Sequence, residues 1–499
     1  MKLIGLIDNT ALLLSIAKRN PAPTDKVAAE FLKSKRNLGS NDRRFILDVL
    51  FVTLRNLTLV EHLTNIIIRN SNIFNNFSKN DSLKAKTEDV ITIINTLLLI
   101  ASNTDFNRYS NVFEYLNQKE KSSNSDINKL ILEVVQHTFC LTNDILTYWK
   151  KNLYFNYELI KNSFLNINNF DNNFDINFLK NIELLHSFPE WIMKELLKNK
   201  YADFDFFSKL SYAFTQNAPI TIRITKHKNI KIEQIEEELS KNNVSIEKCS
   251  LSPAAYNLSK RIFLNENPLY KNGIIEIQDE ASQLVSYALA PEENWVILDA
   301  CAGAGGKSLH LADLQMNRGK IIALDKEYNR LKEIPKRAKN GNITTIFLYL
   351  VDKQNNPIID DENIKHFKNK SFDAVLIDAP CSGMGTLRRD PMKKYRTTPR
   401  LIEKLSEIQY SILEHYSQFL KKGGVLVYAT CSIMPKENEE VVEKFLSQHP
   451  EFAPSPIEEG FSKYGINLPD LGNKYYYTFY PHKYGTDGFF IARMTKKFD

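Results

Sequence analysis

The sequence lacks paired cysteines, long apolar runs and a recognisable export signal. Its five cysteines form no Cys-X-X-Cys pair, which argues against a zinc site and against a secreted disulfide framework. The most apolar run, Val90 to Ala101, contains Thr92 and Asn95 and is too short to span a bilayer. The N-terminal stretch is interrupted by Asp8 and Asn9 and has no signal-peptide layout. We therefore expect a soluble, cytoplasmic protein with no bound metal.

The composition is that of a folded protein with several domains. A chain of 499 residues exceeds one ordinary core, and about two to four domains are expected. Hydrophobic residues make up 43% of the chain, which is enough to bury real cores. The net charge of +6 favours a polyanionic partner, although charge alone does not establish one.

Three segments precede the last part of the chain. Residues 1–155 are predicted to be helical, because glycine is nearly absent and apolar residues recur at helical spacing. Basic side chains interleave with these apolar stripes, and either RNA contact or a solvated helix face would explain them. Residues 156–215 are rich in asparagine and predict a partly helical linker region. Residues 216–290 predict a small α+β domain, with strands at Ile220–Ile224 and Val244–Leu258 and a helix at Ile232–Leu239.

Residues 291–499 alternate short apolar runs with helical stretches. This is the rhythm of a doubly wound parallel sheet, a Rossmann-like α/β domain. The runs expected to form strands are Trp295–Leu298, Lys320–Leu324, Ile346–Val351, Phe372–Ile377 and Val425–Ala429.

A glycine-rich turn follows the first of these runs, in the sequence DACAGAGGKS (299–308). Glycines between a strand and a helix let the backbone approach a ligand closely, but the spacing fits neither GxGxxG nor a P-loop. Asp325 ends the second run, about 20 residues further on, where a carboxylate can accept hydrogen bonds from ribose hydroxyls. Asp352 follows the third run, placed to hold an adenine amino group. An adenosyl group and NAD both fit, and unrelated strand-end carboxylates are the alternative.

Two cysteines lie at the ends of the fourth and fifth runs. Cys381 follows Asp378-Ala-Pro, and Cys431 stands within Thr-Cys-Ser. If the fourth strand lies between the first and fifth, the two thiols become neighbours beside the glycine turn, because open α/β sheets bind ligands at the carboxyl ends of strands. A single cysteine is more often a small buried hydrophobe, but two at adjacent strand ends favour reactivity.

Thiol chemistry suits methylation of carbon 5 of cytosine. That carbon is a poor nucleophile, and thiolate attack on carbon 6 makes it enamine-like. A second group can then assist loss of the carbon 5 proton and release of the enzyme. A free thiol has a pKa of about 8.5, so the site has to favour the thiolate.

At these residues the chain resembles the RsmB/Fmu/Sun-type family of RNA (cytosine-5)-methyltransferases, whose nearest members act on 16S ribosomal RNA. The resemblance spans roughly residues 217–499 and rests on five segments: QDEASQLV (278–285), DACAGAGGKS (299–308), DAPCSGMGTLRRDP (378–391), ATCSIMPKENEEVV (429–442) and DGFFIARM (487–494). It departs from the common pattern at Ala304, where many members carry proline, and at Lys393–Arg396, where many carry Lys-Trp after an aspartate and an apolar residue.

The resemblance implies roles for individual residues. Cys431 would be the nucleophile, Cys381 would aid product release, and Asp378 would lie near the target base. The cofactor would be S-adenosyl-L-methionine, held by Cys301, Ala302, Gly303, Ala304, Gly305, Gly306, Lys307, Asp325, Asp352 and Asp378.

A looser likeness extends to the front of the chain. Residues 1–155, with Leu38-Gly-Ser-Asn-Asp-Arg-Arg44, resemble a NusB-like RNA-binding domain, and residues 216–290 resemble a small RNA-recognition-like domain. The partner implied is RNA, with no obligate protein partner. The arginines expected to contact it are Arg36, Arg43, Arg44, Arg55, Arg388 and Arg389.

Three other functions remain in view. A DNA cytosine-5 methyltransferase would use Cys381 as nucleophile and would carry a Glu-Asn-Val segment and a large recognition insert, which the sequence lacks. A non-catalytic RNA-binding assembly factor would be favoured by loss of Cys431 or the glycine turn, and both are intact. An NAD-dependent oxidoreductase would need a hydride-transfer site that neither cysteine segment supplies.

Overall fold

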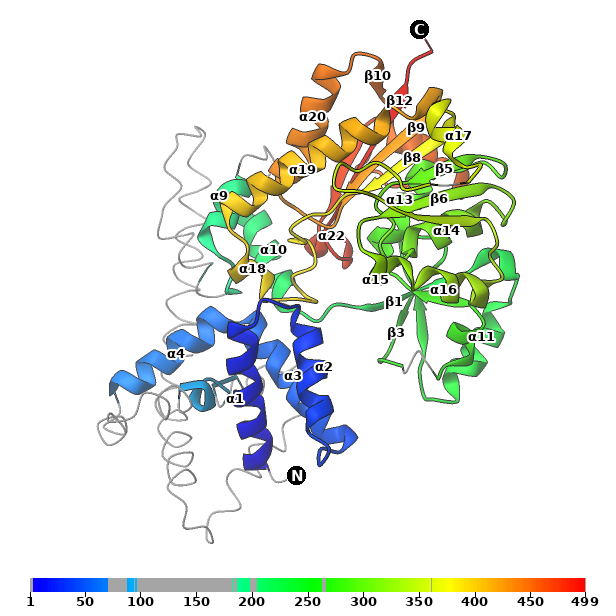
Figure 1. The fold of residues 1–499 in the computed structure, drawn as a ribbon. Helices are drawn as coiled ribbons and strands as arrows, with labels where there is room; N and C mark the ends of the chain where they lie inside the picture. The colour runs from blue at the N-terminus through cyan, green and yellow to red at the C-terminus, as the bar shows by residue number, and fades with distance from the viewer. Residues whose placement is uncertain are drawn as a thin grey trace. The chain divides into compact units, whose positions relative to one another are not determined.

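The computed structural model describes most of the chain outside residues 97–182, namely residues 3–70, 88–93, 95–96, 183, 186–197, 204–262, 266–359 and 361–498 (Figure 1). The chain divides into two compact units. Unit 1 comprises Met1–Gln216 and Leu387–Arg396, and unit 2 comprises Asn217–Thr386 and Thr397–Asp499. Much of the predicted linker, residues 156–215, lies outside the described residues. None of the described helices is long and apolar enough to cross a membrane.

All the regular secondary structure that is described in unit 1 is helical. Its named helices are α1 (Leu3–Arg19), α2 (Thr24–Ser34), α3 (Ser40–Arg55), α4 (Leu57–Asn70), α9 (Glu190–Leu196) and α10 (Phe204–Thr215). The apolar stripes read from the sequence face one core: Val27 and Phe31 of α2 are buried with Ile46 and Val49 of α3. The helical prediction is thus confirmed for the described part of residues 1–155.

A segment from far along the chain completes this core. Residues Leu387–Arg396, here called the strap, include the short helix α18 (Lys393–Arg396) and belong to unit 1. Met392 is buried among the side chains of the N-terminal helices. The Arg396 guanidinium donates to the carbonyls of Ala17 and Ala22, both at 2.9 Å, and so caps the end of α1. The segment Lys393–Arg396, where the sequence differs from the common family pattern, thus includes a residue that caps α1.

Unit 2 begins with a small antiparallel sheet in the order β2-β3-β1-β4. Its elements are β1 (Ile220–Ile224), α11 (Ile232–Ser240), β2 (Ile246–Lys248), β3 (Ala255–Leu258), α12 (Pro268–Lys271) and β4 (Ile275–Ile277). The single strand expected over 244–258 is wrong, because Ser252 and its neighbours turn the chain back and make two strands. The strand β4 has only three residues and was not predicted from the sequence.

The rest of unit 2 is built on an eight-stranded sheet. Five parallel strands lie in the order β9-β8-β5-β6-β7. On its other side β9 pairs with the antiparallel strand β12, which in turn pairs with β10 and β11. The strands are β5 (Val296–Asp299), β6 (Lys320–Asp325), β7 (Ile346–Leu350), β8 (Phe372–Asp378), β9 (Leu420–Thr430), β10 (Phe452–Pro454), β11 (Tyr476–Phe479) and β12 (Phe489–Lys496). This Rossmann-like sheet confirms the predicted fold class of residues 291–499, and β8 lies between β5 and β9.

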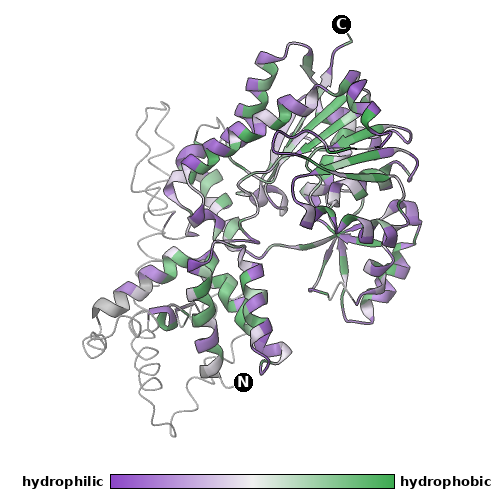
Figure 2. Ribbon diagram, in the orientation of Figure 1, coloured by the Kyte–Doolittle hydropathy of each residue, from purple (hydrophilic) through white to green (hydrophobic). Residues whose placement is uncertain are grey.

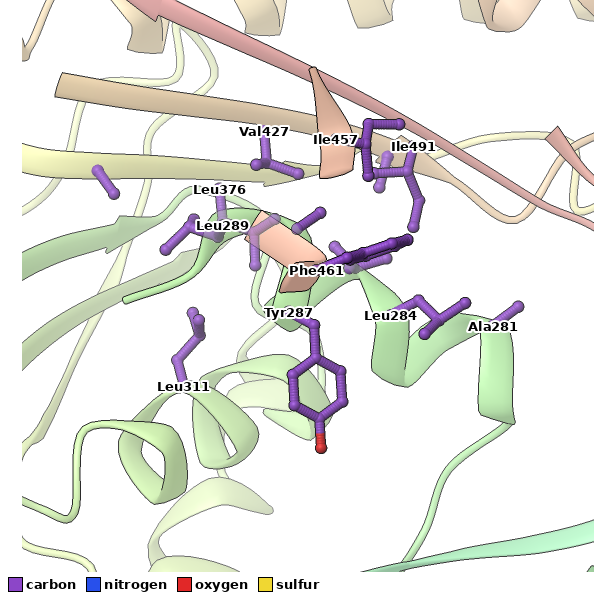
Figure 3. Close-up of a cluster of buried hydrophobic side chains, with 14 of the residues drawn as sticks. Ala281, Leu284, Tyr287, Leu289, Leu311, Leu376, Val427, Ile457, Phe461 and Ile491 are labelled. Atoms are coloured by element: carbon purple, nitrogen blue, oxygen red, sulfur yellow. The ribbon is translucent and has the colours of Figure 1, made fainter. Parts of the chain in front are cut away.

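Both faces of the large sheet are covered, which explains the nearly continuous apolar runs of its strands. Along β8, Ala374 and Leu376 face one core, whereas Val375 and Ile377 face the other. The first core includes α13 (Glu280–Leu289), α14 (Gly306–Leu314) and α21 (Ile457–Phe461), and part of it is drawn in Figure 3. The second includes α17 (Ile364–Lys368), α19 (Pro399–Ser417) and α20 (Glu439–Gln448). Figure 2 shows the strands as predominantly hydrophobic and helices such as α19 as two-sided.

A buried ionic cluster ties the small sheet to the large one within unit 2. Arg223 of β1 and Asp313 of α14 are both buried, with 3.2 Å between Nη1 and Oδ2. His227 places Nδ1 2.7 Å from the other carboxylate oxygen of Asp313. Burial opposes ionisation of Asp313, but the hydrogen bonds from His227 and the charge of Arg223 outweigh it and lower the pKa of Asp313 to about 2. The cluster fixes β1 against the helix that follows the glycine turn.

Candidate active site

The glycine turn joins β5 to α14 at the carboxyl edge of the sheet. Gly305 has φ of +84°, and a Cβ there would lie 2.6 Å from the Ile334 side chain, so only glycine fits. A Cβ built at Gly303 or Gly306 meets nothing within 4 Å. The backbone is therefore open on the side where a ligand would approach the first N–H groups of α14. This open cradle fits an adenosyl cofactor.

Asp299 stabilises the glycine turn through a hydrogen bond with Ser308, a role that the sequence analysis did not assign. It is fully buried, and the Ser308 hydroxyl donates to its Oδ2 at 2.6 Å. Burial raises the pKa of Asp299 to about 7, because the charged form loses its hydration. Its place at the head of the DACAGAGGKS segment was the one available signal.

Asp325 and Asp352 stand at the ends of neighbouring strands, as their positions in the sequence indicated. Asp325 accepts the backbone N–H of Gly303 at 2.8 Å and that of Glu327 at 2.8 Å, so it braces the glycine turn. Asp352 follows β7 and accepts the backbone N–H groups of Gln354 and Asn356. Burial works against ionisation, but the hydrogen bonds from Asn356 and Gln354 hold the pKa of Asp352 below its usual value.

Lys307 and Asp378 form an ion pair between the start of α14 and the end of β8. The Lys307 ammonium lies 2.6 Å from Asp378 Oδ2 and 5.0 Å from the centre of the Phe489 ring. The lysine side chain is 10% exposed and the aspartate 30%. Sequence reasoning placed Lys307 in the cofactor loop, and the structure adds that its charge is directed to Asp378.

Cys381 and Cys431 are brought together from the ends of β8 and β9. Their sulfur atoms are 3.3 Å apart, and both residues are partly exposed. The contact with Cys431, together with burial and the nearby Glu437 carboxylate, raises the pKa of Cys381 well above its usual value. The adjacency expected from the strand order is observed.

Two glycines allow the Cys381 loop to lie flat against its neighbours. A Cβ on Gly385 would clash with the Gly488 carbonyl oxygen. A Cβ on Gly488 would lie 2.6 Å from Gly385 Cα, which is also too close. Gly385 donates to the Cys431 carbonyl at 2.9 Å, and Gly488 donates to the Gly385 carbonyl at 2.8 Å. The glycine of the DGFFIARM segment is thus required for close backbone packing beside the cysteines.

The six arginines expected to contact RNA belong to unit 1 and differ in exposure. Arg55 and Arg388 are 6% and 4% exposed, and Arg55 donates to the Arg388 carbonyl, so RNA contact does not fit their burial. Arg43 donates to the carbonyls of Leu32, Lys35 and Leu38 and closes the end of α2. Those exposed to solvent are Arg36, Arg44 and Arg389.

The sheet and its carboxyl edge define a class of protein. A doubly wound sheet with a glycine turn after β5 and a carboxylate at the end of β6 is a nucleoside-binding arrangement. Cys381 and Cys431 follow β8 and β9 at the same edge of this Rossmann-like sheet. Residues 286–495 match the family described as 16S rRNA methyltransferase RsmB/F. The chain belongs to this family, its cofactor is S-adenosylmethionine, and it is a methyltransferase of ribosomal RNA.

Curated relatives support the assignment. A probable ribosomal RNA small subunit methyltransferase B of Bacillus subtilis is 35% identical over 318 residues, which cover 62% of this chain and 67% of that protein. The protein of the same name from Coxiella burnetii is 33% identical over 306 residues, covering 60% and 69%.

Solved structures are similar in fold. The crystal structure of PH0851 has a TM-score of 0.67 at 20% identity and covers 98% of this chain and 99% of that chain. NSun6 from Pyrococcus horikoshii, solved with SFG, has a TM-score of 0.53 at 21% identity and covers 63% of this chain and 100% of that chain. At these identities the likeness concerns the fold alone.

Proposed function

We propose that this protein methylates carbon 5 of a cytosine in 16S ribosomal RNA through a covalent bond between Cys431 and carbon 6 of the base. The observation that carries the proposal is the 3.3 Å separation of the two sulfur atoms at adjacent strand ends. Methylation at a nitrogen or a ribose oxygen needs no thiol, whereas carbon 5 of cytosine needs a nucleophile at carbon 6 and help in leaving. Two adjacent thiols match that pair of requirements.

The reaction uses the two cysteines in turn. The Cys431 thiolate adds to carbon 6, and the electron pair of the 5,6 double bond becomes available at carbon 5. S-adenosylmethionine supplies an electrophilic methyl group. Cys381 then assists removal of the carbon 5 proton, and as the double bond re-forms the bond between carbon 6 and Cys431 breaks. With its sulfur 3.3 Å from that of Cys431, Cys381 lies close to the base that Cys431 holds.

Charged side chains around the thiols have supporting roles. Asp378 lies at the end of the strand that leads to Cys381, where its carboxylate can accept a hydrogen bond from the exocyclic amino group of cytosine. Lys307 forms an ion pair with Asp378 and orients its carboxylate. The cofactor is assigned to the turn from Cys301 to Lys307, with Asp325 for the ribose and Asp352 for the adenine.

Bisulfite sequencing of ribosomal RNA tests the proposal directly. Bisulfite converts cytosine to uracil but spares 5-methylcytosine. We expect one or more protected cytosines in 16S ribosomal RNA from cells with the gene, lost on its deletion and restored by the wild-type gene but not by a Cys431→Ala copy. Identical protection in all four samples would refute the assignment.

Unit 1 is proposed to supply RNA affinity, as a NusB-like domain would. Replacing the exposed Arg36 and Arg44 by alanine should weaken RNA binding and flatten the dependence of log affinity on log salt by about 1.4 to 1.8 if both contact phosphate. Arg44 has only a 3.9 Å contact with Asp48, so its loss should leave α3 folded. Titration with RNA at several salt concentrations measures the slope.

The control for this experiment is cofactor binding, which should not change because the glycine turn belongs to unit 2. Arg43→Ala makes a useful contrast, since Arg43 closes α2 and its loss should lower thermal stability. A folded Arg36→Ala, Arg44→Ala protein with wild-type affinity and slope would show that these arginines are solvated surface residues with no contact to RNA.

A further inference from the structure

A buried carboxylate bridges the two loops that carry the cysteines. Glu437, at the end of a short 3-10 helix (Pro435–Glu437), is fully buried. Its Oε1 accepts the backbone N–H of Ser382 at 2.8 Å, and its Oε2 accepts the hydroxyls of Ser382 and Ser432. Ser382 directly follows Cys381, and Ser432 directly follows Cys431. One carboxylate thus holds the residue after each thiol.

Neighbouring side chains extend this bridge. Gln409 of α19 donates to Glu437 Oε1 at 3.0 Å and to the Pro380 carbonyl at 3.0 Å, so the residue before Cys381 is held as well. Asn438 accepts the Thr430 hydroxyl at 2.6 Å and donates to the Ser432 carbonyl at 3.0 Å. The residues before and after each cysteine are therefore held by hydrogen bonds. Glu437, Asn438 or Gln409, which donates to Glu437, makes each of these bonds.

The arrangement is costly unless it serves the site. The four donors to Glu437 are neutral: one backbone N–H, two hydroxyls and one amide. Burying a carboxylate among neutral groups costs free energy, and apolar side chains could fill the same space without that cost. What a shared carboxylate provides, and apolar packing does not, is a directional link that sets two loops at a fixed spacing.

We propose that Glu437 and Asn438 are positioning residues that hold the thiols of Cys381 and Cys431 at the spacing the reaction requires. The inference rests on the proposed function of the two cysteines. Neither side chain is assigned contact with base or cofactor; both act through the loops. Loss of the link should leave the cofactor turn intact and reduce the fraction of molecules whose two sulfur atoms are adjacent.

Disulfide formation measures that adjacency without requiring catalysis. The probe is diamide, which oxidises the two thiols to one disulfide and takes up their two hydrogens on its nitrogen–nitrogen double bond. Peptide mass spectrometry follows the Cys381–Cys431 pair as a loss of two hydrogens. We expect Glu437→Gln to slow this reaction by about tenfold or more, because the amide cannot accept all four donors. The matched control is Glu440→Gln, an exposed glutamate three residues on, which should react at the wild-type rate.

Steady-state kinetics provide the second measurement. Glu437→Gln should lower kcat by about a hundredfold, the effect of misplacing reacting groups by about 1 Å. The KM for S-adenosylmethionine should change by less than about twofold, because the glycine turn is separate from the link. If Glu437→Gln fails to fold, Ser382→Ala takes its place: it removes one hydroxyl donor, keeps the backbone N–H, and should slow cross-linking and kcat together.

The outcomes separate this inference from the proposed function. Slower cross-linking in Glu437→Gln, with no methylation of cytosine by the wild-type protein, would support the positioning role and refute the proposed reaction. A folded Glu437→Gln or Ser382→Ala protein with wild-type cross-linking rate and kcat would overturn the positioning role, even if methylation is demonstrated. A kcat loss accompanied by an equal loss of cofactor affinity would overturn it as well, because it indicates general disorder of the site.

Discussion

Cys431→Ala is expected to abolish methyl transfer to RNA while leaving S-adenosylmethionine bound. The thiol sits at the end of β9, and its sulfur is 3.3 Å from that of Cys381. Without it, nothing adds to carbon 6 and carbon 5 stays unreactive, so we expect a loss of at least about a thousandfold in single-turnover rate, or about 4 kcal/mol of barrier. Transfer of tritiated methyl groups to RNA measures the rate, and calorimetry measures cofactor binding.

The interpretation of that experiment depends on an intact fold. Cys431 is partly exposed and packs against a hydrophobic core of unit 2, so a thermal unfolding scan should accompany the kinetics. Turnover above about a tenth of the wild-type rate in the folded variant would exclude Cys431 as the nucleophile. Loss of cofactor binding in the folded variant would contradict the separate roles given to the thiols and the glycine turn.

Cys381→Ala is expected to trap the enzyme on its product. If Cys381 assists removal of the carbon 5 proton, its loss leaves Cys431 bonded to carbon 6 of methylated RNA. A denaturing gel should then show a slowly migrating protein–RNA band that forms with S-adenosylmethionine and is absent from the Cys381→Ala, Cys431→Ala double variant. We expect the adduct to accumulate to a large fraction of the enzyme, because formation remains fast and only release is slowed.

The same gel distinguishes the two possible orders of the cysteines. The 3.3 Å distance between the two sulfur atoms does not distinguish them, so the choice of Cys431 as nucleophile rests on the family resemblance. A stable band with Cys431→Ala, and none with Cys381→Ala, would exchange the roles and give Cys381 the nucleophilic step, as in DNA cytosine-5 methyltransferases.

The strands and their ends could be predicted from the sequence because burial on both faces leaves a continuous apolar run that stops where the chain reaches solvent. Asp325, Asp378 and Cys431 each follow or end such a run, and strand order then brings Cys381 to Cys431. The glycine turn was equally visible, since Gly305 occupies a backbone conformation that few other residues adopt.

Contacts between distant segments could not be predicted in this way. Glu437 lies in a segment that the resemblance identified, yet its partner Ser382 is 55 residues away, and only the folded chain pairs them. Arg55 has the charge and helical spacing of an RNA contact but is covered by Arg388, 333 residues further along. Local pattern sets which face of a helix is polar, and it cannot tell whether a later segment will bury that face.

The strap has a consequence for how the protein is made. During synthesis the N-terminal helices emerge first, but Met392 and Arg396, which fill their core and cap α1, emerge only after β8 and the Cys381 loop. Unit 1 therefore cannot finish folding until more than three quarters of the 499 residues have been translated. A fragment ending at residue 216 would lack these contacts, and unit 1 is best produced as part of the full chain. Completion of unit 1 thus waits for the part of the chain that also carries Cys381, so the N-terminal helices do not form a complete unit early in synthesis.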